Sequence, residues 1–267
     1  MDTGLKTPLM DSFRRGDAPV EVRLDAARGT LAPRGQEQLA LLALLVDDAD
    51  AAVREAAATT LAALPAAAVA AVIARADTPV DLVRFFGERG IAPAAGAQTS
   101  AADDDAPLVQ TADAWDTIDE AAPDDAVSQT LSITQQLQQM GIVERVRAAM
   151  KGTREMRAIL VRDPNKMVSS AVLASPKLTM AEVEAFAKMA NVTEDVLRAI
   201  AQNRAWVKNY AVAASLARNP KTPVGMSLNL LPRLIERDVR GLSVDRNVPE
   251  PLRMAARKKL VKGRGNG

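Results

Sequence analysis

The sequence predicts an all-α protein in which a flexible acidic linker joins two helical-repeat modules. Three observations support this fold class. Apolar residues make up 48% of the 267-residue chain but aromatic residues only 3%, so alanine, valine, leucine and methionine must form the core. Apolar positions recur at the three- and four-residue spacing of helices. A 28-residue pattern, long enough for two short helices, repeats in the C-terminal part of the chain.

The first module is predicted over 1–91, where alanine-rich helical patterns alternate with turn signals. One leucine pattern and a second apolar pattern that stops at Pro65 predict two helices. A further helix is predicted to begin at Asp77-Thr78-Pro79, where an N-cap-type residue is followed by a proline. The apolar contacts of these helices are expected from Leu39, Leu42, Leu45, Val53, Leu61, Leu64, Leu82, Phe85 and Phe86.

The interval between Arg89 and Arg145 is strongly acidic. It contains ten Asp or Glu residues and no Lys or Arg. Its first part consists mainly of alanine, proline, glycine and aspartate, which cannot bury enough apolar surface to offset the entropy lost on ordering. The sequence therefore predicts a flexible acidic linker over 92–127.

The second module is predicted over 128–267 and contains the 28-residue repeat. Blocks that start at 163, 191, 219 and 247 align Asp or Asn at position 1 and aliphatic residues at positions 6 and 10. Two helices are expected in each block, at positions 4–12 and 16–27. The residue at position 1 is expected to close the preceding helix in the left-handed conformation. Only neighbouring blocks can cover the apolar faces, so the blocks should stack.

Several segments carry a family resemblance. Ala217-Arg-Asn-Pro-Lys-Thr-Pro223 precedes an apolar helix, and Asp245-Arg-Asn-Val-Pro249 follows the next one. Together with Leu45-Val-Asp-Asp-Ala-Asp-Ala-Ala-Val-Arg54, these segments resemble the leucine-rich repeat variant and HEAT-like families of α-solenoids. The resemblance implies a stack of helical repeats. Members of such families are mostly interaction scaffolds and some bind nucleic acid, so the resemblance alone selects neither function.

The formal net charge of +1 conceals a strong asymmetry. The chain up to residue 140 has 10 basic and 22 acidic residues, whereas the remainder has 24 basic and 11 acidic residues. The net charges of the two parts are therefore −12 and +13. An asymmetry of this size indicates an anionic partner for the basic part or docking of one part on the other, although stacked repeats also tolerate charged outer faces.

The composition excludes many kinds of chemistry. The chain has no His and no Cys, which removes disulfides, thiolate nucleophiles, Cys/His zinc sites and imidazole bases. No nucleophile-elbow, phosphate-loop or zinc-protease motif occurs. We therefore expect no enzymatic activity, no cofactor and no metal site. A cytoplasmic location is expected, because an early acid and the lack of a long apolar run argue against a signal peptide.

Five residues are candidates for binding a partner. Trp115 and Ile118 lie three apart among acids, as in a short helix that folds on a partner or packs on the next helix. Arg204, Lys208 and Tyr210 belong to a segment that combines aromatic residues with cations, the composition of a binding hot spot or a base-stacking site.

The repeat alignment separates the two aromatic residues of that segment. Trp206 shares its column with leucines and is expected in the core. Tyr210 shares its column with Glu182 and Asp238, which predicts an exposed position for all three.

A cluster of cations lies near the C-terminal end of the sequence. It could bind phosphates, or it could stabilise the end of a final helix through the helix dipole. The members of this candidate anion site are Arg253, Arg257, Lys258, Lys259 and Lys262.

Two functions follow from these patterns. The first is a scaffold that binds protein partners on its repeat surfaces, with the acidic linker able to dock on the basic repeats of the same chain. The alternative is a nucleic-acid binding module in which the basic repeats track phosphates and the acidic linker competes for the same face. No membrane association is expected.

Overall fold

The computed structural model describes residues 4–5, 7–32, 34–95, 107–109 and 126–264, with no description of the side chains at 126–132 and 263–264. Helices account for all the regular secondary structure of these residues, and no strand is found among them. The predicted all-α class is therefore confirmed. The chain divides into two compact units, of which the first comprises 1–157 with 166–177 and the second 158–165 with 178–267.

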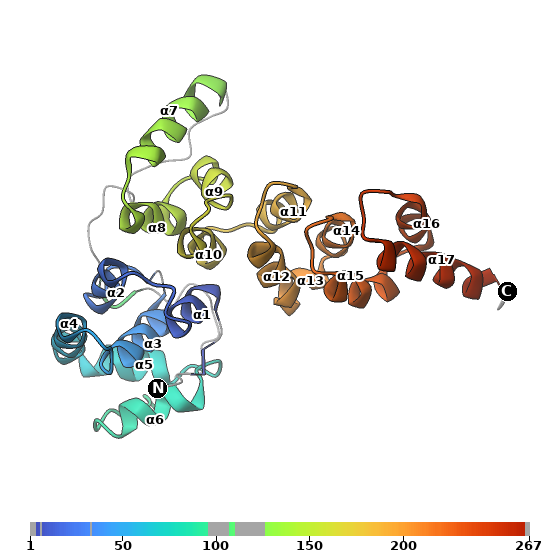
Figure 1. The fold of residues 1–267 in the computed structure, drawn as a ribbon. Coiled ribbons are helices and arrows are strands. Elements are labelled where there is room, and N and C mark those ends of the chain that lie inside the picture. The colour runs from blue at the N-terminus through green and yellow to red at the C-terminus, as the bar shows by residue number, and fades with distance from the viewer. Residues whose placement is uncertain (1–3, 6, 33, 96–106, 110–125, 265–267) are drawn as a thin grey trace. The chain divides into compact units, whose positions relative to one another are not determined.

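Most of the helices are short and are joined by short turns, whereas α6 and α7 are far apart in sequence (Figure 1). In chain order they are α1 (Pro8–Arg14), α2 (Val20–Ala27), α3 (Gly35–Leu45), α4 (Ala51–Ala63), α5 (Ala66–Ile73), α6 (Val80–Gly87), α7 (Ala126–Gln139), α8 (Ile142–Lys151), α9 (Arg154–Leu160), α10 (Lys166–Ala174), α11 (Met180–Lys188), α12 (Glu194–Gln202), α13 (Arg204–Lys208), α14 (Tyr210–Arg218), α15 (Val224–Leu230), the 3₁₀ helix η3 (Leu231–Arg233), α16 (Glu236–Val244) and α17 (Glu250–Arg264).

The core of the first unit surrounds α3, which packs against α2, α4, α5 and α6. Ten of its eleven residues are buried, including the consecutive polar residues Gln36, Glu37 and Gln38. The predicted apolar patterns of α3, α4 and α6 are confirmed as helices. The N-cap predicted at Asp77-Thr78-Pro79 is wrong, because Pro79 itself takes the N-cap position without a side-chain cap and the Asp77 carboxylate accepts a hydrogen bond from Gln36 (2.9 Å).

Two helices from the predicted second module pack within the first unit. Arg147 of α8 donates two hydrogen bonds to Asp25 of α2, one of them 2.8 Å long from its Nε atom. Asp25 is only 6% exposed, so this charge pair joins the two helices inside the unit. α10 packs against α1 and α8, and Ser175 behind it donates to the Met150 carbonyl at 2.7 Å. The compact units therefore do not follow the predicted boundaries at 91 and 128.

Two parts of the predicted linker hydrogen-bond to the first unit. The Ala94 amide donates to the Ala70 carbonyl at 3.1 Å. The amides of Leu108 and Val109 both donate to the side-chain oxygen of Gln38. The segments 92–95 and 107–109 of the predicted linker therefore bind helices α5 and α3, respectively, through polar backbone groups.

The helices of the second unit lie in two rows. α11, α14 and α16 form one row, and α12, α15 and α17 form the other (Figure 1). Within this unit α11 packs against α14, α14 against α15, and α16 against α17. The 28-residue period predicts α10 and α12 residue for residue, and it places α11, α15 and α16 within two residues at their N-termini. The second helix expected in the block from 191 is divided into α13 and α14, because Asn209 caps the start of α14.

Asn219 closes a helix in a way that its repeat position did not predict. Its backbone is extended (φ −76°, ψ 119°), and no described residue other than glycine has a positive φ. Instead, its side-chain amide donates to the carbonyls of Ala187 and Met189, both at 2.9 Å, at the end of α11. The same side chain accepts from the Lys221 amide at 3.1 Å. One buried asparagine therefore satisfies the end of a helix in the preceding repeat and shapes the turn into its own.

Among the described residues, no single helix has both the length and the apolar character needed to cross a membrane. Only α4 and α5 taken together have this length and apolar character, and the pair is bent by 96° between the two helices.

Candidate functional site

One edge of the second unit carries half-exposed apolar side chains at the N-terminal ends of neighbouring helices. Met180 begins α11, Tyr210 begins α14 and Ile235 caps α16. The hydrogen bonds of Asn219 join the C-terminal ends of α11 and α14, so these helices run parallel and their N-termini share one edge. Met180 and Tyr210 are each 39% exposed and Ile235 is 49% exposed.

Tyr210 is held in place by its hydroxyl group. The hydroxyl donates to the carboxylate of Asp238 in α16 and accepts from the Ile235 amide at 3.2 Å. It therefore satisfies the amide of the N-cap residue of a helix that lies one repeat further along the chain. The ring is fixed while more than a third of the side chain remains open to a partner, which reduces the entropy that binding would cost.

Asp238 joins two repeats through a cluster of polar contacts. Besides Tyr210, it accepts from Arg218 at the end of α14 at 2.6 Å. The hydrogen bond from Tyr210, followed by the charges of Arg218 and Arg237, lowers the pKa of Asp238 although burial opposes the shift. Asp238 is only 3% exposed.

The prediction of an exposed column at Glu182, Tyr210 and Asp238 is therefore wrong for both acids. Glu182 is 2% exposed because it folds back in a capping box with Thr179. Asp238 is covered because its partners come from the neighbouring repeat. Tyr210 alone matches the prediction.

Four exposed cations lie close in sequence to Tyr210 and Ile235. Arg204 and Lys208 lie on α13, immediately before Tyr210, and both are exposed. Arg233 and Arg237 flank Ile235 and are exposed as well. We call these four cations, with Met180, Tyr210 and Ile235, the basic–apolar edge. Trp206, predicted in the core, is half-buried, and Val207 beside it is buried.

Most of the predicted anion-binding cations bind the protein itself. Arg253 donates to the Asp245 carbonyl at 3.4 Å and Arg257 to the Ser243 carbonyl at 3.0 Å, both at the end of α16. Lys259 donates to the carbonyls of Leu231, Pro232 and Leu234, around η3, at 2.8 to 3.2 Å. Lys258 and Lys262 are exposed. Three of the five candidates thus donate to carbonyls at or near the ends of helices.

Replacing Lys259 with methionine is expected to lower the free energy of unfolding of the second unit by about 1 kcal/mol, because three carbonyls lose a charged donor. Lys258→Met is the matched control, since that side chain is exposed at the neighbouring position. Urea unfolding followed by circular dichroism measures both changes. Equal effects of the two substitutions would show that the contacts of Lys259 contribute nothing specific.

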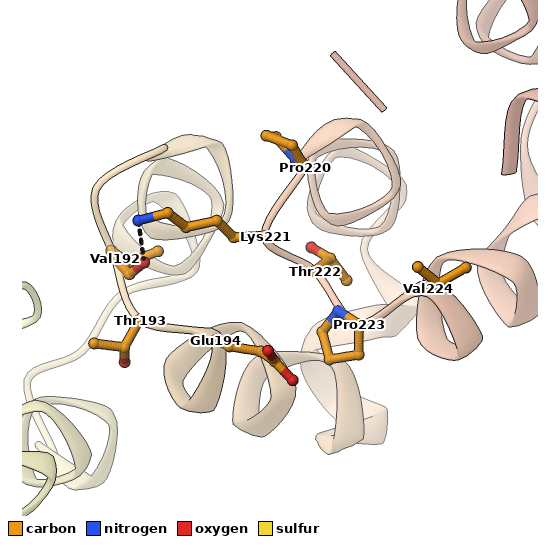
Figure 2. A pocket seen from close by; sticks show the side chains of 8 residues that line it. All are labelled: Val192, Thr193, Glu194, Pro220, Lys221, Thr222, Pro223 and Val224. Carbon is orange, nitrogen blue, oxygen red and sulfur yellow. Dashed lines mark hydrogen bonds between the residues drawn. The ribbon is translucent and has the colours of Figure 1, made fainter. Parts of the chain in front are cut away.

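A pocket of about 610 Å³ lies between the turns that precede α12 and α15 (Figure 2). Lys221 reaches across it and donates to the Val192 carbonyl at 3.3 Å, while Glu194 is paired with Arg198. The buried hydroxyls of Thr193 and Thr222 have no described partner. Both charged side chains of the lining are already engaged, so the pocket offers little to attract an ionic ligand.

Trp115 and Ile118 lie outside the described residues. Of the basic–apolar edge, sequence reasoning identified Arg204, Lys208 and Tyr210 but missed the residues from α11 and α16. The only available signal was the position of Met180 and Ile235 at predicted helix starts. Comparison with protein-family models, curated proteins and solved structures finds no match to this chain.

Proposed function

We propose that the protein is a non-enzymatic scaffold of the α-solenoid type, whose basic–apolar edge binds acidic protein segments that carry an aromatic or aliphatic anchor. The observation that carries the proposal is the fixed, half-exposed ring of Tyr210, whose hydroxyl contacts Asp238 and the Ile235 amide. Tyrosine and arginine residues are both enriched in binding hot spots.

The charge of the edge supports an acidic partner. Four exposed cations lie close in sequence to the N-termini of α14 and α16, where the helix dipoles add positive potential. The exposed acid Glu236 is paired with Arg240 and offsets little of this charge. The apolar side chains of the edge provide a surface on which an apolar side chain of the partner can be buried. A partner segment without apolar side chains would gain nothing from that surface.

The chain itself contains a segment of the proposed composition. Residues 112–122 have the sequence ADAWDTIDEAA, in which Trp115 and Ile118 are the anchors among four acids. We propose that this segment competes with protein partners for the edge. A labelled peptide with this sequence is therefore the first probe.

The test uses the full chain with Trp115→Ala and Ile118→Ala, which removes the competing anchors. Binding of a fluorescein-labelled 112–122 peptide is followed by fluorescence anisotropy at low salt. Tyr210→Ala in this background is expected to weaken binding about tenfold, which corresponds to about 1.4 kcal/mol. Lys208→Ala should weaken it less, and added salt should weaken it further.

Lys188→Ala is the matched control, because Lys188 is an exposed lysine at the opposite end of α11. An equal loss with Lys188→Ala, or no binding by the parent chain, would refute the proposal. Tighter binding of a single-stranded oligonucleotide that depends on Lys258 and Lys262 but not on Tyr210 would establish the nucleic-acid alternative instead.

A further inference from the structure

The first unit contains a buried side chain that binds an extended backbone. Gln38 of α3 is 1% exposed. Its oxygen accepts from the amides of Leu108 at 2.7 Å and Val109 at 3.2 Å. Its nitrogen donates to the carbonyls of Gly29 at 2.6 Å and Val109 at 3.5 Å. The side-chain amide therefore forms hydrogen bonds with the main chain of a segment about 70 positions away in sequence.

The side-chain oxygen of Gln38 depends on the segment 107–109 for its hydrogen-bond donors. Its nitrogen would keep the Gly29 carbonyl if the segment 107–109 left, but the described partners of its oxygen are the two amides of that segment. An unsatisfied acceptor at a buried position is unfavourable. The site is consequently built to hold a backbone with two successive free N–H groups.

Gly29 supplies the space for that occupant. A Cβ atom at this position would lie 2.9 Å from Cγ2 of Val109 and 3.2 Å from the nitrogen of Gln38. The φ angle of Gly29 is +76°, which disfavours other residues independently of the contact. The backbone at Gly29 thus receives an aliphatic side chain at the position that Val109 occupies.

We propose that Gln38 and Gly29 form a docking site for an extended aliphatic segment of a partner protein, and that the chain's own residues 107–109 occupy it until such a partner competes. The recognised features are two successive main-chain N–H groups and an aliphatic side chain against Gly29. Recognition of an extended backbone in this way resembles the addition of a strand to a sheet edge, where main-chain bonds supply affinity and one side-chain position supplies selectivity. The site is separate from the basic–apolar edge of the second unit.

Proline substitutions in the segment 107–109 should release this segment from Gln38 and leave the site empty. In the full chain, Leu108→Pro and Val109→Pro remove both N–H donors and leave Gln38 unchanged. A fluorescein-labelled peptide of residues 105–111, DAPLVQT, is then titrated into this variant and into the natural chain. We expect the variant to bind the peptide at least tenfold more tightly, because the tethered segment of the natural chain competes at high effective concentration.

Two controls define the contacts. Adding Gln38→Ala to the proline variant should abolish binding, and a peptide with prolines at the positions of residues 108 and 109 should not bind. Circular dichroism should show that the proline variant keeps its helices. An unfolded proline variant would mean that 107–109 is a permanent part of the core and would overturn the proposal. Equal binding to the variant and the natural chain, or no binding to a folded variant, would overturn it as well.

Discussion

Replacing Asn219 with aspartate is expected to lower the free energy of unfolding of the second unit by about 3 kcal/mol at neutral pH. The substitution keeps the shape of the side chain but removes the amide group that donates to the carbonyls of Ala187 and Met189. A carboxylate would then face two carbonyl oxygens at the negative end of α11, in a position that is 4% exposed in the natural chain. Each lost bond at a buried site costs about 1 to 3 kcal/mol, and the like charges add to this.

Urea unfolding of a chain with Trp115→Phe measures this change, because Trp206 then reports on the second unit alone. Asn219→Ala should cost about 2 kcal/mol, since it removes the donors without adding a charge. Asn229→Ala is the matched control, because Asn229 is exposed on α15 and should change stability by no more than about 0.5 kcal/mol. An aspartate variant as stable as the natural chain would contradict the role assigned to Asn219.

Replacing Asp238 with alanine is expected to cost about 2 kcal/mol at pH 7. The change removes the acceptor of Tyr210 and Arg218, and with it the charged contact between α14 and α16. Glu236→Ala is the control from the same helix turn. Its ion pair with Arg240 is largely exposed, and exposed pairs contribute about 0 to 1 kcal/mol.

The contribution of Asp238 should depend on pH. Its pKa in the folded chain is lowered from the ordinary value of 3.8, chiefly by the hydrogen bond from Tyr210. A group whose folded pKa is depressed stabilises the fold above its unfolded pKa and loses that contribution as the pH falls through the folded value. The difference in unfolding free energy between the natural chain and Asp238→Ala should therefore be constant near neutrality and shrink below about pH 4. A difference that stays constant down to pH 2 would contradict this explanation.

The period of the repeat predicted the helices of the second unit well, because it depends on local chemistry. Aliphatic residues at helical spacing and turn residues at the block starts define α10 and α12 to the residue. The role of Asn219 could not be predicted from the same pattern. Its conformation depends on carbonyls about 30 positions earlier in the chain, and the left-handed preference of asparagine is only a local tendency.

The candidate site was predictable only in part for a related reason. A carboxylate such as Asp238 is expected at the surface unless a partner covers it, and its partners come from the neighbouring repeat. The cations Arg257 and Lys259 were candidates for anion binding, whereas both donate to carbonyls at or near the ends of other helices. Charge counts along a sequence do not show which cations are already engaged.

The docking site at Gln38 left a weak signal in the sequence. Gln36, Glu37 and Gln38 form a polar run at the start of a helix that otherwise contains leucine and alanine, and all three are buried. A buried polar run needs partners, which implies that another segment covers it. The identity of that segment depends on contacts across the fold, so sequence patterns could not supply it.

Tyr210 is the only tyrosine in the chain. Its ultraviolet absorbance therefore reports on the contact between α14 and α16 alone. Partial burial and the hydrogen bond to Asp238 raise the pKa of its phenol above the ordinary value of 10.0. Phenolate absorbs further into the near ultraviolet than phenol or tryptophan. The absorbance that appears on alkaline titration therefore comes from one ring, and the pH at which it appears reports whether that single contact between repeats is closed or open.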